Sequence, residues 1–464
     1  MTSAKAALES LAIGTEKRIA VVLEIGSAYT RCGFAGESCP RHIVATKVRR
    51  YMTDKIVSVF SDEFLKNPTD LYDVLIDFIE FIYFKCLLVN PKDRRVVIVE
   101  PLVWPDIVRQ TLARVLFEHY YVPSLLFYPS PFAALLPLGV STALVVDCGY
   151  AETSVLPVYE GYGIIKGWDA IRLAGKTLHG EIEHFLREHA TVTDGQDEKR
   201  YGGVSEDVLE DIKARTCFLG DTLISSQYQA LSDVLGDSES RAEEKPKRLV
   251  PPNVDYPLDG ISTLVIPGIL RDQAPEVLFK PNDDGEGESI VTTILDSIRK
   301  CPMDTRRALS NNIVVVGGTA MLPGFLARLQ LELSDVAKNE KYSKLLPGAD
   351  FLFHELSVPA NVACWVGGAI LASLDSLPEN SLSRARFLET NRLPDWTSCD
   401  PEARQVRPEK ISLATALRRL SATPKPRKTS GGRRASASDA VGASTPASSR
   451  LRTVSPVSED KNES

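Results

Sequence analysis

The stretch ALVVDCGYAETSVLPVY, residues 143–159, decides how the rest of the chain is interpreted. An apolar run leads into the turn Asp147-Cys148-Gly149 and a second apolar run leads back, which predicts two antiparallel strands joined by a tight turn. Residues 20–34, AVVLEIGSAYTRCGF, repeat the pattern with Glu24-Ile25-Gly26 at the turn. Two such hairpins, one from each half of a duplicated fold, would bind the phosphates of a nucleotide between their turns.

The composition limits the possible classes of protein. The chain has 464 residues, 44% of them hydrophobic and 25% charged, and a formal net charge of −7. These values favour two lobes of a soluble globular protein and give no reason to expect nucleic acid or membrane as a partner. No apolar run approaches the roughly 20 residues of a membrane span, and the N-terminus lacks the apolar core of a signal peptide. The eight cysteines form no CxxC pair, which indicates reduced, buried thiols of a cytosolic protein and disfavours zinc.

Strands alternate with helices along most of the chain, which predicts an α/β fold with helices packed on sheets. The predicted helices are 69–88, 105–119, 131–138, 173–189, 205–217, 290–300, 304–310, one from 323, and 362–374; further strands are predicted at 95–100, 123–127 and 313–316. Residues 190–203 are interpreted as a polar break and 233–254 as a charged surface insertion.

The two ends of the chain differ from the middle. Residues 1–17 are expected to form a flexible leader. Residues 379–464 are expected to form a tail, disordered from about residue 400, because serine, alanine, proline and basic residues replace aromatic ones there. The basic residues allow contact with nucleic acid or microtubules, although a solvated tail is the simpler interpretation.

Three glycine turns each follow an apolar strand: Glu24-x-Gly26, Asp147-x-Gly149 and Gly317-Gly318-Thr319. Glycine lets backbone N–H groups approach phosphate oxygens closely. An acidic residue at the end of such a strand can hold the hydration shell of Mg²⁺. A single acidic-glycine turn is most often only a turn, but two in register and a third behind another strand predict a nucleotide-binding fold.

Four other stretches resemble actin and the actin-related proteins: GFAG at 33–36, DIKARTC at 211–217, NIVVVGGTAMLPGF at 312–325 and CWVGGAILASL at 364–374. The resemblance runs from Ala20 to Leu377, and sugar kinases and Hsp70-type chaperones lack these stretches. It implies a duplicated, RNase H-like, two-lobed ATPase fold, with residues 18–155 as the first lobe, 156–361 as the second and 362–378 as a helix that returns to the first. It also implies ATP or ADP with Mg²⁺. The implied nucleotide contacts are Gly26, Ser27, Arg31, Asp147, Gly149, Lys213, Gly317, Gly318 and Thr319, with Glu24 and Asp147 holding Mg²⁺ through water.

Several residues depart from the actin pattern where hydrolysis takes place. The glutamine that orients the attacking water in actin aligns with Ser130, and the water-relay histidine aligns with Ser154. Tyr150-Ala151 replaces the second Asp-Gly pair of the family. Positioning is most of the catalysis in phosphoryl transfer, and a serine is too short to replace the glutamine. We therefore expect a degenerate ATPase fold without catalytic residues, with weak or absent hydrolysis and a nucleotide bound structurally.

The segment 42–68 is shorter than its counterpart in the family, which implies a shortened subdomain 2. The missing part is the loop that an actin subunit inserts into its neighbour. The resemblance implies that the receiving cleft is kept, with Gly139 on one wall and Ile370, Leu371 and Leu374 on the other. A subunit that receives such a loop but has none to insert would cap the pointed end of a filament.

Four stretches resemble one branch of the family, the actin-related subunit at the pointed end of dynactin: VNPKDRRVVIVE at 89–100, VLEDIKARTCF at 208–218, PPNVDYPLDG at 251–260 and NRLPDWTS at 391–398. The resemblance implies a cytoplasmic, cytoskeletal capping subunit that supports dynein-driven transport on microtubules. The implied partners are actin-related protein one and actin of the dynactin filament, the other pointed-end subunits and, indirectly, dynein, with no membrane and no direct nucleic acid. Two alternatives are a nuclear actin-related protein of a chromatin-remodelling complex, favoured by the basic tail, and an active ATPase or small-molecule kinase.

Overall fold

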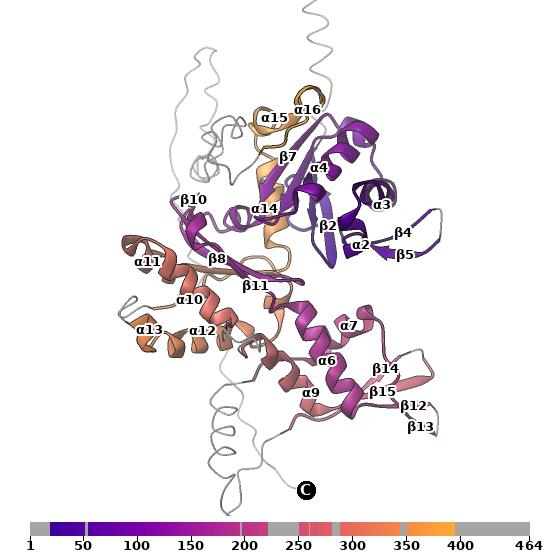
Figure 1. The fold of residues 1–464 in the computed structure, drawn as a ribbon, viewed down its shortest axis with the longest axis vertical. Helices are drawn as coiled ribbons and strands as arrows, with labels where there is room; N and C mark the ends of the chain where they lie inside the picture. The colour runs from indigo at the N-terminus through magenta and orange to yellow at the C-terminus, as the bar shows by residue number, and fades with distance from the viewer. Residues whose placement is uncertain are drawn as a thin grey trace, which may run out of the picture. The chain divides into compact units, whose positions relative to one another are not determined.

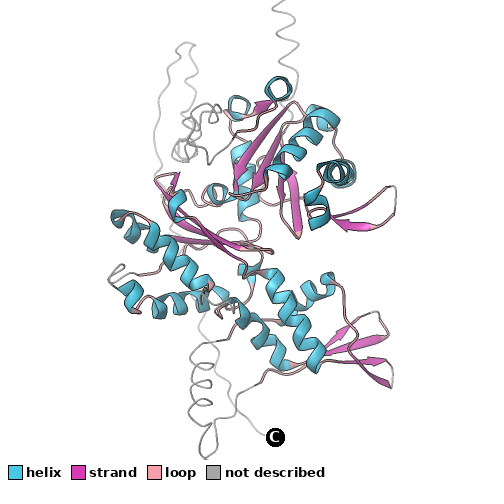
Figure 2. Cartoon of the chain, in the orientation of Figure 1, coloured by secondary structure: helices cyan, strands magenta, loops and turns pink. Residues whose placement is uncertain are grey.

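The structure is a computed structural model that describes residues 19–51, 54–194, 197–220, 250–258, 260–280, 288–343 and 350–394 (Figure 1). The predicted leader, residues 233–249 of the predicted insertion and the part of the predicted tail from residue 395 lie outside these residues. Helices and strands alternate along the described chain, as predicted, and form a mixed α/β fold (Figure 2). None of the helices formed by described residues is long and apolar enough to cross a lipid bilayer.

The first lobe is built on a six-stranded sheet whose strand order is β17-β7-β6-β1-β2-β3. The strands are β1 (Val21–Ile25), β2 (Tyr29–Phe34), β3 (His42–Ala45), β6 (Val96–Glu100), β7 (Ser124–Pro129) and β17 (Leu382–Ser383). Strand β1 is antiparallel to β2 and parallel to β6, and β6 is parallel to β7. All five residues of β6 are buried, as a continuous apolar run predicts for an inner parallel strand.

Helices cover this sheet where the sequence predicts them. Helix α3 (Pro68–Phe81) begins at Asn67, whose side chain accepts a hydrogen bond from the Thr69 N–H, and α4 (Asp106–Arg114) covers the same core. Each continues into a π-helical turn, η1 (Ile82–Leu87) and η3 (Val115–His119). A short α5 (Ser130–Ala133) follows β7, and η2 (Pro91–Asp93) precedes β6.

The residues between β3 and α3 form a small unit at the edge of the first lobe. A hairpin of β4 (Lys47–Arg49) and β5 (Ile56–Ser58) is followed by α2 (Asp62–Lys66). Strand β4 ends at Arg49 and β5 begins at Ile56, and the hairpin extends beyond α2 in Figure 1. Together with β3, these elements make up the segment 42–68 that is predicted to be a shortened subdomain 2.

The second lobe repeats the arrangement with the strand order β10-β9-β8-β16. The strands are β8 (Ala143–Cys148), β9 (Thr153–Tyr159), β10 (Tyr162–Gly163) and β16 (Ile313–Val316), and β11 (Asp169–Ile171) also pairs with β9. Strands β8 and β9 belong to this sheet, which corrects the prediction that the first lobe extends to residue 155. Strand β8 is antiparallel to β9 and parallel to β16. The relation of β8, β9 and β16 is thus the same as that of β1, β2 and β6, which is the duplication predicted from the two hairpins.

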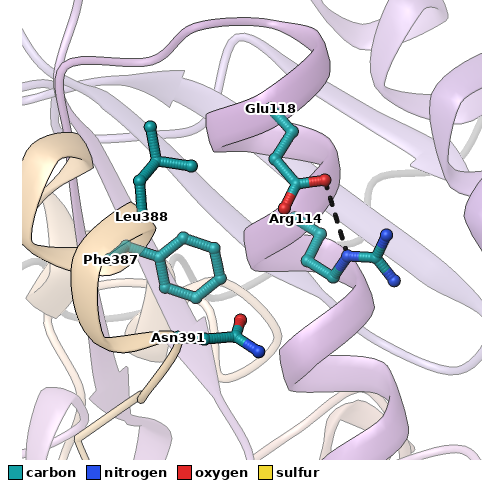
Figure 3. A pocket seen from close by; sticks show the side chains of 5 residues that line it. All are labelled: Arg114, Glu118, Phe387, Leu388 and Asn391. Atoms are coloured by element: carbon teal, nitrogen blue, oxygen red, sulfur yellow. Dashed lines mark ion pairs between the residues drawn. The ribbon is translucent and has the colours of Figure 1, made fainter.

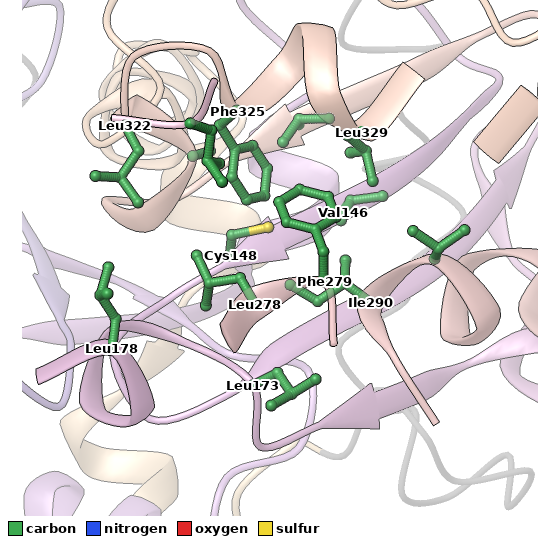
Figure 4. Packing of buried hydrophobic residues seen from close by; sticks show 14 of the residues in the cluster. Val146, Cys148, Leu173, Leu178, Leu278, Phe279, Ile290, Leu322, Phe325 and Leu329 are labelled. Carbon is green, nitrogen blue, oxygen red and sulfur yellow. The ribbon is translucent and has the colours of Figure 1, made fainter. Parts of the chain in front are cut away.

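The helices of the second lobe enclose an apolar core, part of which Figure 4 shows around Phe279, Phe325 and Cys148. They are α6 (Gly175–His189), α7 (Glu206–Thr216), α9 (Gly268–Gln273), α10 (Ile290–Lys300), α11 (Met303–Ser310), α12 (Phe325–Val336) and α13 (Glu340–Ser343), with 3-10 turns η4 (Ile165–Gly167), η5 (Ala274–Leu278) and η6 (Thr319–Met321). Helix α7 begins as predicted at Ser205, whose hydroxyl accepts a hydrogen bond from the Val208 N–H.

A second sheet in this lobe corrects the interpretation of residues 190–203 as a polar break. Strands β12 (Thr191–Asp194) and β13 (Asp197–Arg200) form a hairpin, and β12 pairs with β15 (Ser262–Ile266), which pairs with β14 (Val254–Pro257). Val254, the last residue of the predicted insertion, is therefore the first residue of β14.

Helix α14 (Ala363–Ala372) joins the two lobes. It packs in a cluster that contains Val22 and Val99 of the first sheet and Val145 of the second. Its Trp365 is fully buried, and the indole N–H donates a hydrogen bond to the Val22 carbonyl at 3.1 Å. The seam between the lobes is thus closed by the CWVGG sequence of this helix.

The chain remains ordered beyond the last predicted helix, which corrects the prediction that a tail begins at residue 379. Helix α15 (Leu377–Asn380) leads to β17, which pairs with β7, and to α16 (Arg384–Thr390). Phe387 of α16 is buried, with its ring centroid 4.9 Å from that of Phe117. Figure 3 shows Phe387, Leu388 and Asn391 beside Arg114 and Glu118, where they line a cavity of about 340 Å³.

Candidate functional site

A cleft of about 920 Å³ lies between the lobes, and the three predicted glycine turns line it. The cleft brings together every residue predicted to contact nucleotide or metal: Glu24, Gly26, Ser27, Arg31, Asp147, Gly149, Lys213, Gly317, Gly318 and Thr319. Ser130, Tyr150, Ala151 and Ser154, at which the sequence departs from the actin pattern, line the same cleft.

The first turn, between β1 and β2, carries a buried ion pair. The Arg31 guanidinium lies 2.8 Å from Glu24 Oε1, and the two side chains are only 12% and 17% exposed. The other carboxylate oxygen, Oε2 of Glu24, and the Nε of Arg31 are buried without a hydrogen-bond partner. Burial raises the pKa of Glu24 and the nearby Asp147 raises it further, whereas Arg31 opposes this shift.

The second turn, between β8 and β9, is held to the third by hydrogen bonds. The Gly149 carbonyl accepts one from the Thr319 hydroxyl at 2.6 Å and one from the Gly175 N–H at 3.2 Å. Burial raises the pKa of Asp147, while Arg31 and a hydrogen bond from Ser130 oppose the shift. Ser130 is thus buried against an acidic residue of the phosphate turn.

The third turn requires glycine at Gly317. Its φ of +100° is in the region that residues with a side chain rarely adopt. A methyl group there would lie 2.2 Å from the Cys148 carbonyl oxygen. The end of β16 therefore lies against the end of β8 with no room for a side chain at Gly317, which brings the second and third turns together.

On the far side of the cleft, Lys213 belongs to a network that the sequence did not predict. Its Nζ lies 2.5 Å from Glu210 Oε2, and His179 Nε2 lies 2.9 Å from the same oxygen. Burial opposes ionisation of Glu210, but the hydrogen bond with His179 and the charge of Lys213 outweigh it and lower the pKa to about 2. The Tyr150 ring packs edge-on against His179, with 5.3 Å between centroids. The three-residue spacing of Glu210 and Lys213 could have predicted their ion pair on one face of α7. Nothing in the sequence predicted that His179 lies beside them.

The orphaned atoms of the first turn test whether a nucleotide with Mg²⁺ fits the cleft. Glu24 Oε2 is a buried acceptor and Arg31 Nε a buried donor, and buried polar atoms are nearly always paired in folded proteins. A water molecule bound to a cation would donate to the first, and a phosphate oxygen would accept from the second. Glu24 and Arg31 therefore fit a nucleotide with Mg²⁺ in this cleft.

The four residues predicted to form the receiving cleft differ in exposure. Gly139 is exposed, Ile370 and Leu374 are half-buried, and Leu371 is only 3% exposed and belongs to the core. Leu371 therefore supports this surface from beneath and does not line it.

Comparison with known proteins agrees with the fold. The actin family model matches residues 15–392. Actin-related protein 10 of Dictyostelium discoideum is 30% identical over 435 residues, which covers 82% of this chain and 90% of that protein. The duplicated fold, the cleft and these matches show that the chain belongs to the actin family.

Proposed function

We propose that this chain is a structural subunit of dynactin that caps the pointed end of the actin-like filament and bridges it to other pointed-end subunits. The observation that carries the proposal is the short β4–β5 hairpin, at the place where the resemblance to actin implies the loop by which an actin subunit inserts into its neighbour. The similarity to an actin-related protein 10 and the four stretches that resemble the pointed-end subunit support the same assignment.

The proposal also requires a surface that receives the loop of a filament subunit, and several exposed apolar side chains are candidates for it. Tyr162 and Met303 are 72% and 80% exposed, and Ile165 is exposed between them in the sequence. The turn before Tyr162 is tied to the loop after Gly139, since the Gly161 N–H donates to the Ser141 carbonyl at 2.7 Å. Large contiguous apolar patches are rare on monomeric proteins, and we propose that these exposed side chains, with the half-buried Ile370 and Leu374, form the surface that takes the loop of a filament subunit.

In this proposal the cleft holds ATP or ADP with Mg²⁺ as a structural ligand. When bound, Mg²⁺ would neutralise phosphate charge beside Glu24 and Asp147. Hydrolysis is expected to be weak, because the Ser130 side chain is too short to orient a water in line as the glutamine of actin does. A ligand bound only by the folded protein stabilises it by mass action.

The test is affinity purification of the full chain from cells, with identification of the bound proteins. We expect dynactin subunits, and their recovery should fall for Tyr162→Asp combined with Met303→Asp. Leu331→Asp in α12, also an exposed apolar site at 41%, is the matched control and should leave recovery unchanged. Recovery of chromatin-remodelling subunits in place of dynactin would overturn the proposal, and phosphate release at the rate of actin would overturn its ligand part.

A further inference from the structure

Charged side chains from the two lobes meet at the mouth of the cleft. Lys47 of β4 has its Nζ 3.0 Å from Asp207 Oδ1 and 3.8 Å from Glu206 Oε2, at the first turn of α7. The partners are 160 residues apart in the sequence, and all three line the cleft. Lys47 is 30% exposed and the acidic residues 62% and 70%, so the contact is at the solvent boundary of the site.

Both ends of this contact are connected to the phosphate turns. The hydroxyl of Thr46, which precedes Lys47, donates a hydrogen bond to the Gly26 carbonyl of the first turn at 2.7 Å. On the opposite side, Glu206 accepts a hydrogen bond from the Tyr150 hydroxyl of the second turn at 3.4 Å. Separation of β4 from α7 would therefore break ion pairs between two segments that are each hydrogen-bonded to a phosphate turn.

We propose that Lys47, Glu206 and Asp207 form a latch that sets the rate at which nucleotide enters and leaves the cleft. The proposal rests on the proposed binding of nucleotide. Because the latch joins protein to protein, it favours the closed cleft in the free and the loaded protein alike. Weakening the latch should therefore accelerate entry and release by similar factors and leave the dissociation constant nearly unchanged.

The measurement is stopped-flow binding and displacement of ATP carrying a fluorescent N-methylanthraniloyl group. Lys47→Ala should raise the association and dissociation rates by about two- to fivefold, the range expected for a partly exposed ion pair. Lys47→Arg keeps the charge and should keep both rates near those of the wild type. In the wild-type protein both rates should rise with salt, because salt screens exposed charges, whereas Lys47→Ala should lose most of this dependence.

The neighbouring Arg49 provides a matched control. It lies on the same strand and pairs with Asp54 of its own hairpin at 3.2 Å, so Arg49→Ala should leave the rates unchanged. Equal rates in the wild type and Lys47→Ala, or a change in dissociation rate alone, would overturn the latch and leave nucleotide binding standing. Failure of the wild type to bind the fluorescent ATP would overturn both proposals.

Discussion

Gly367→Ala would test whether close approach of α14 to the first lobe stabilises the protein. A methyl group at this position would lie 1.9 Å from the Ala133 carbonyl oxygen and 2.5 Å from its carbonyl carbon. These atoms belong to the backbone of α5 and cannot rotate away as the end of a side chain can. Helix α14 or α5 must therefore shift to admit the methyl group.

The expected change in the free energy of unfolding is the balance of two opposing effects. Alanine is better than glycine inside a helix by about 1 kcal/mol. Overpacking a core costs about 1–3 kcal/mol, and more where the backbone must move. Since a carbon–oxygen contact needs about 3.3 Å, the required shift exceeds roughly 1 Å and the packing cost dominates. We expect the free energy of unfolding to fall by about 2 kcal/mol.

Gly180→Ala is the matched control. Gly180 is an exposed residue inside α6, and a methyl group there would meet no atom within 4 Å. The same substitution should therefore stabilise the protein by up to about 1 kcal/mol. The assay is urea unfolding followed by tryptophan fluorescence and circular dichroism, with midpoints compared at equal slope. Stabilisation of both variants would refute the packing argument.

The remaining predictions concern helix α16 and two charged clusters of the cleft, one around Glu210 and one formed by Arg31 and Glu24. Phe387→Ala should lower the free energy of unfolding by about 3–5 kcal/mol, whereas Leu388→Ala, at a half-exposed neighbour, should change it little; equal effects in thermal unfolding would contradict the packing of α16. Because the pKa of Glu210 is lower in the folded protein, its charge stabilises the fold above the unfolded-state pKa near 4.5, and this contribution disappears as pH falls toward 2. Glu210→Gln should therefore remove stabilisation of order 2 kcal/mol at neutral pH, and a wild type and variant with identical pH profiles would contradict it. Arg31→Met should destabilise by about 3 kcal/mol because Glu24 is left buried and unpaired, and the double variant with Glu24→Gln should recover part of the loss in the same urea assay.

The fold could be predicted wherever the sequence is locally periodic or carries a distinctive turn. The hairpins at Gly26 and Gly149 and the GGT turn identified the duplicated core, because an acidic-glycine turn that is weak evidence alone recurs in register. The β12–β13 hairpin was missed because its strands, Thr191–Asp194 and Asp197–Arg200, are mostly polar in sequence. Strand β17 has two residues, too few for any periodicity, and is defined only by its pairing with β7.

The residues of the candidate site that lie on local motifs could be predicted, and those that join it by long-range contacts could not. Its glycine and acidic residues lie on local motifs, and the structure brings them to one cleft. The contacts of Lys47 with α7 and of His179 with Glu210 are long-range, and no local pattern in a single sequence specifies them. Leu371 was assigned to a surface because an apolar helix gives little indication of which side chain faces outward.

The docking of residues 382–394 on the first lobe has a consequence for how the protein is made. Arg109 donates a hydrogen bond to the Pro394 carbonyl at 2.8 Å, across a sequence separation of 285 residues. At about 5–20 residues per second, the ribosome needs roughly 15–60 s between these two residues. During that time β7 presents an unpaired edge, which is prone to association with other strands. The first lobe, although synthesised first, is completed last, so a chain truncated before β17 should aggregate during synthesis even though every residue of the cleft is present.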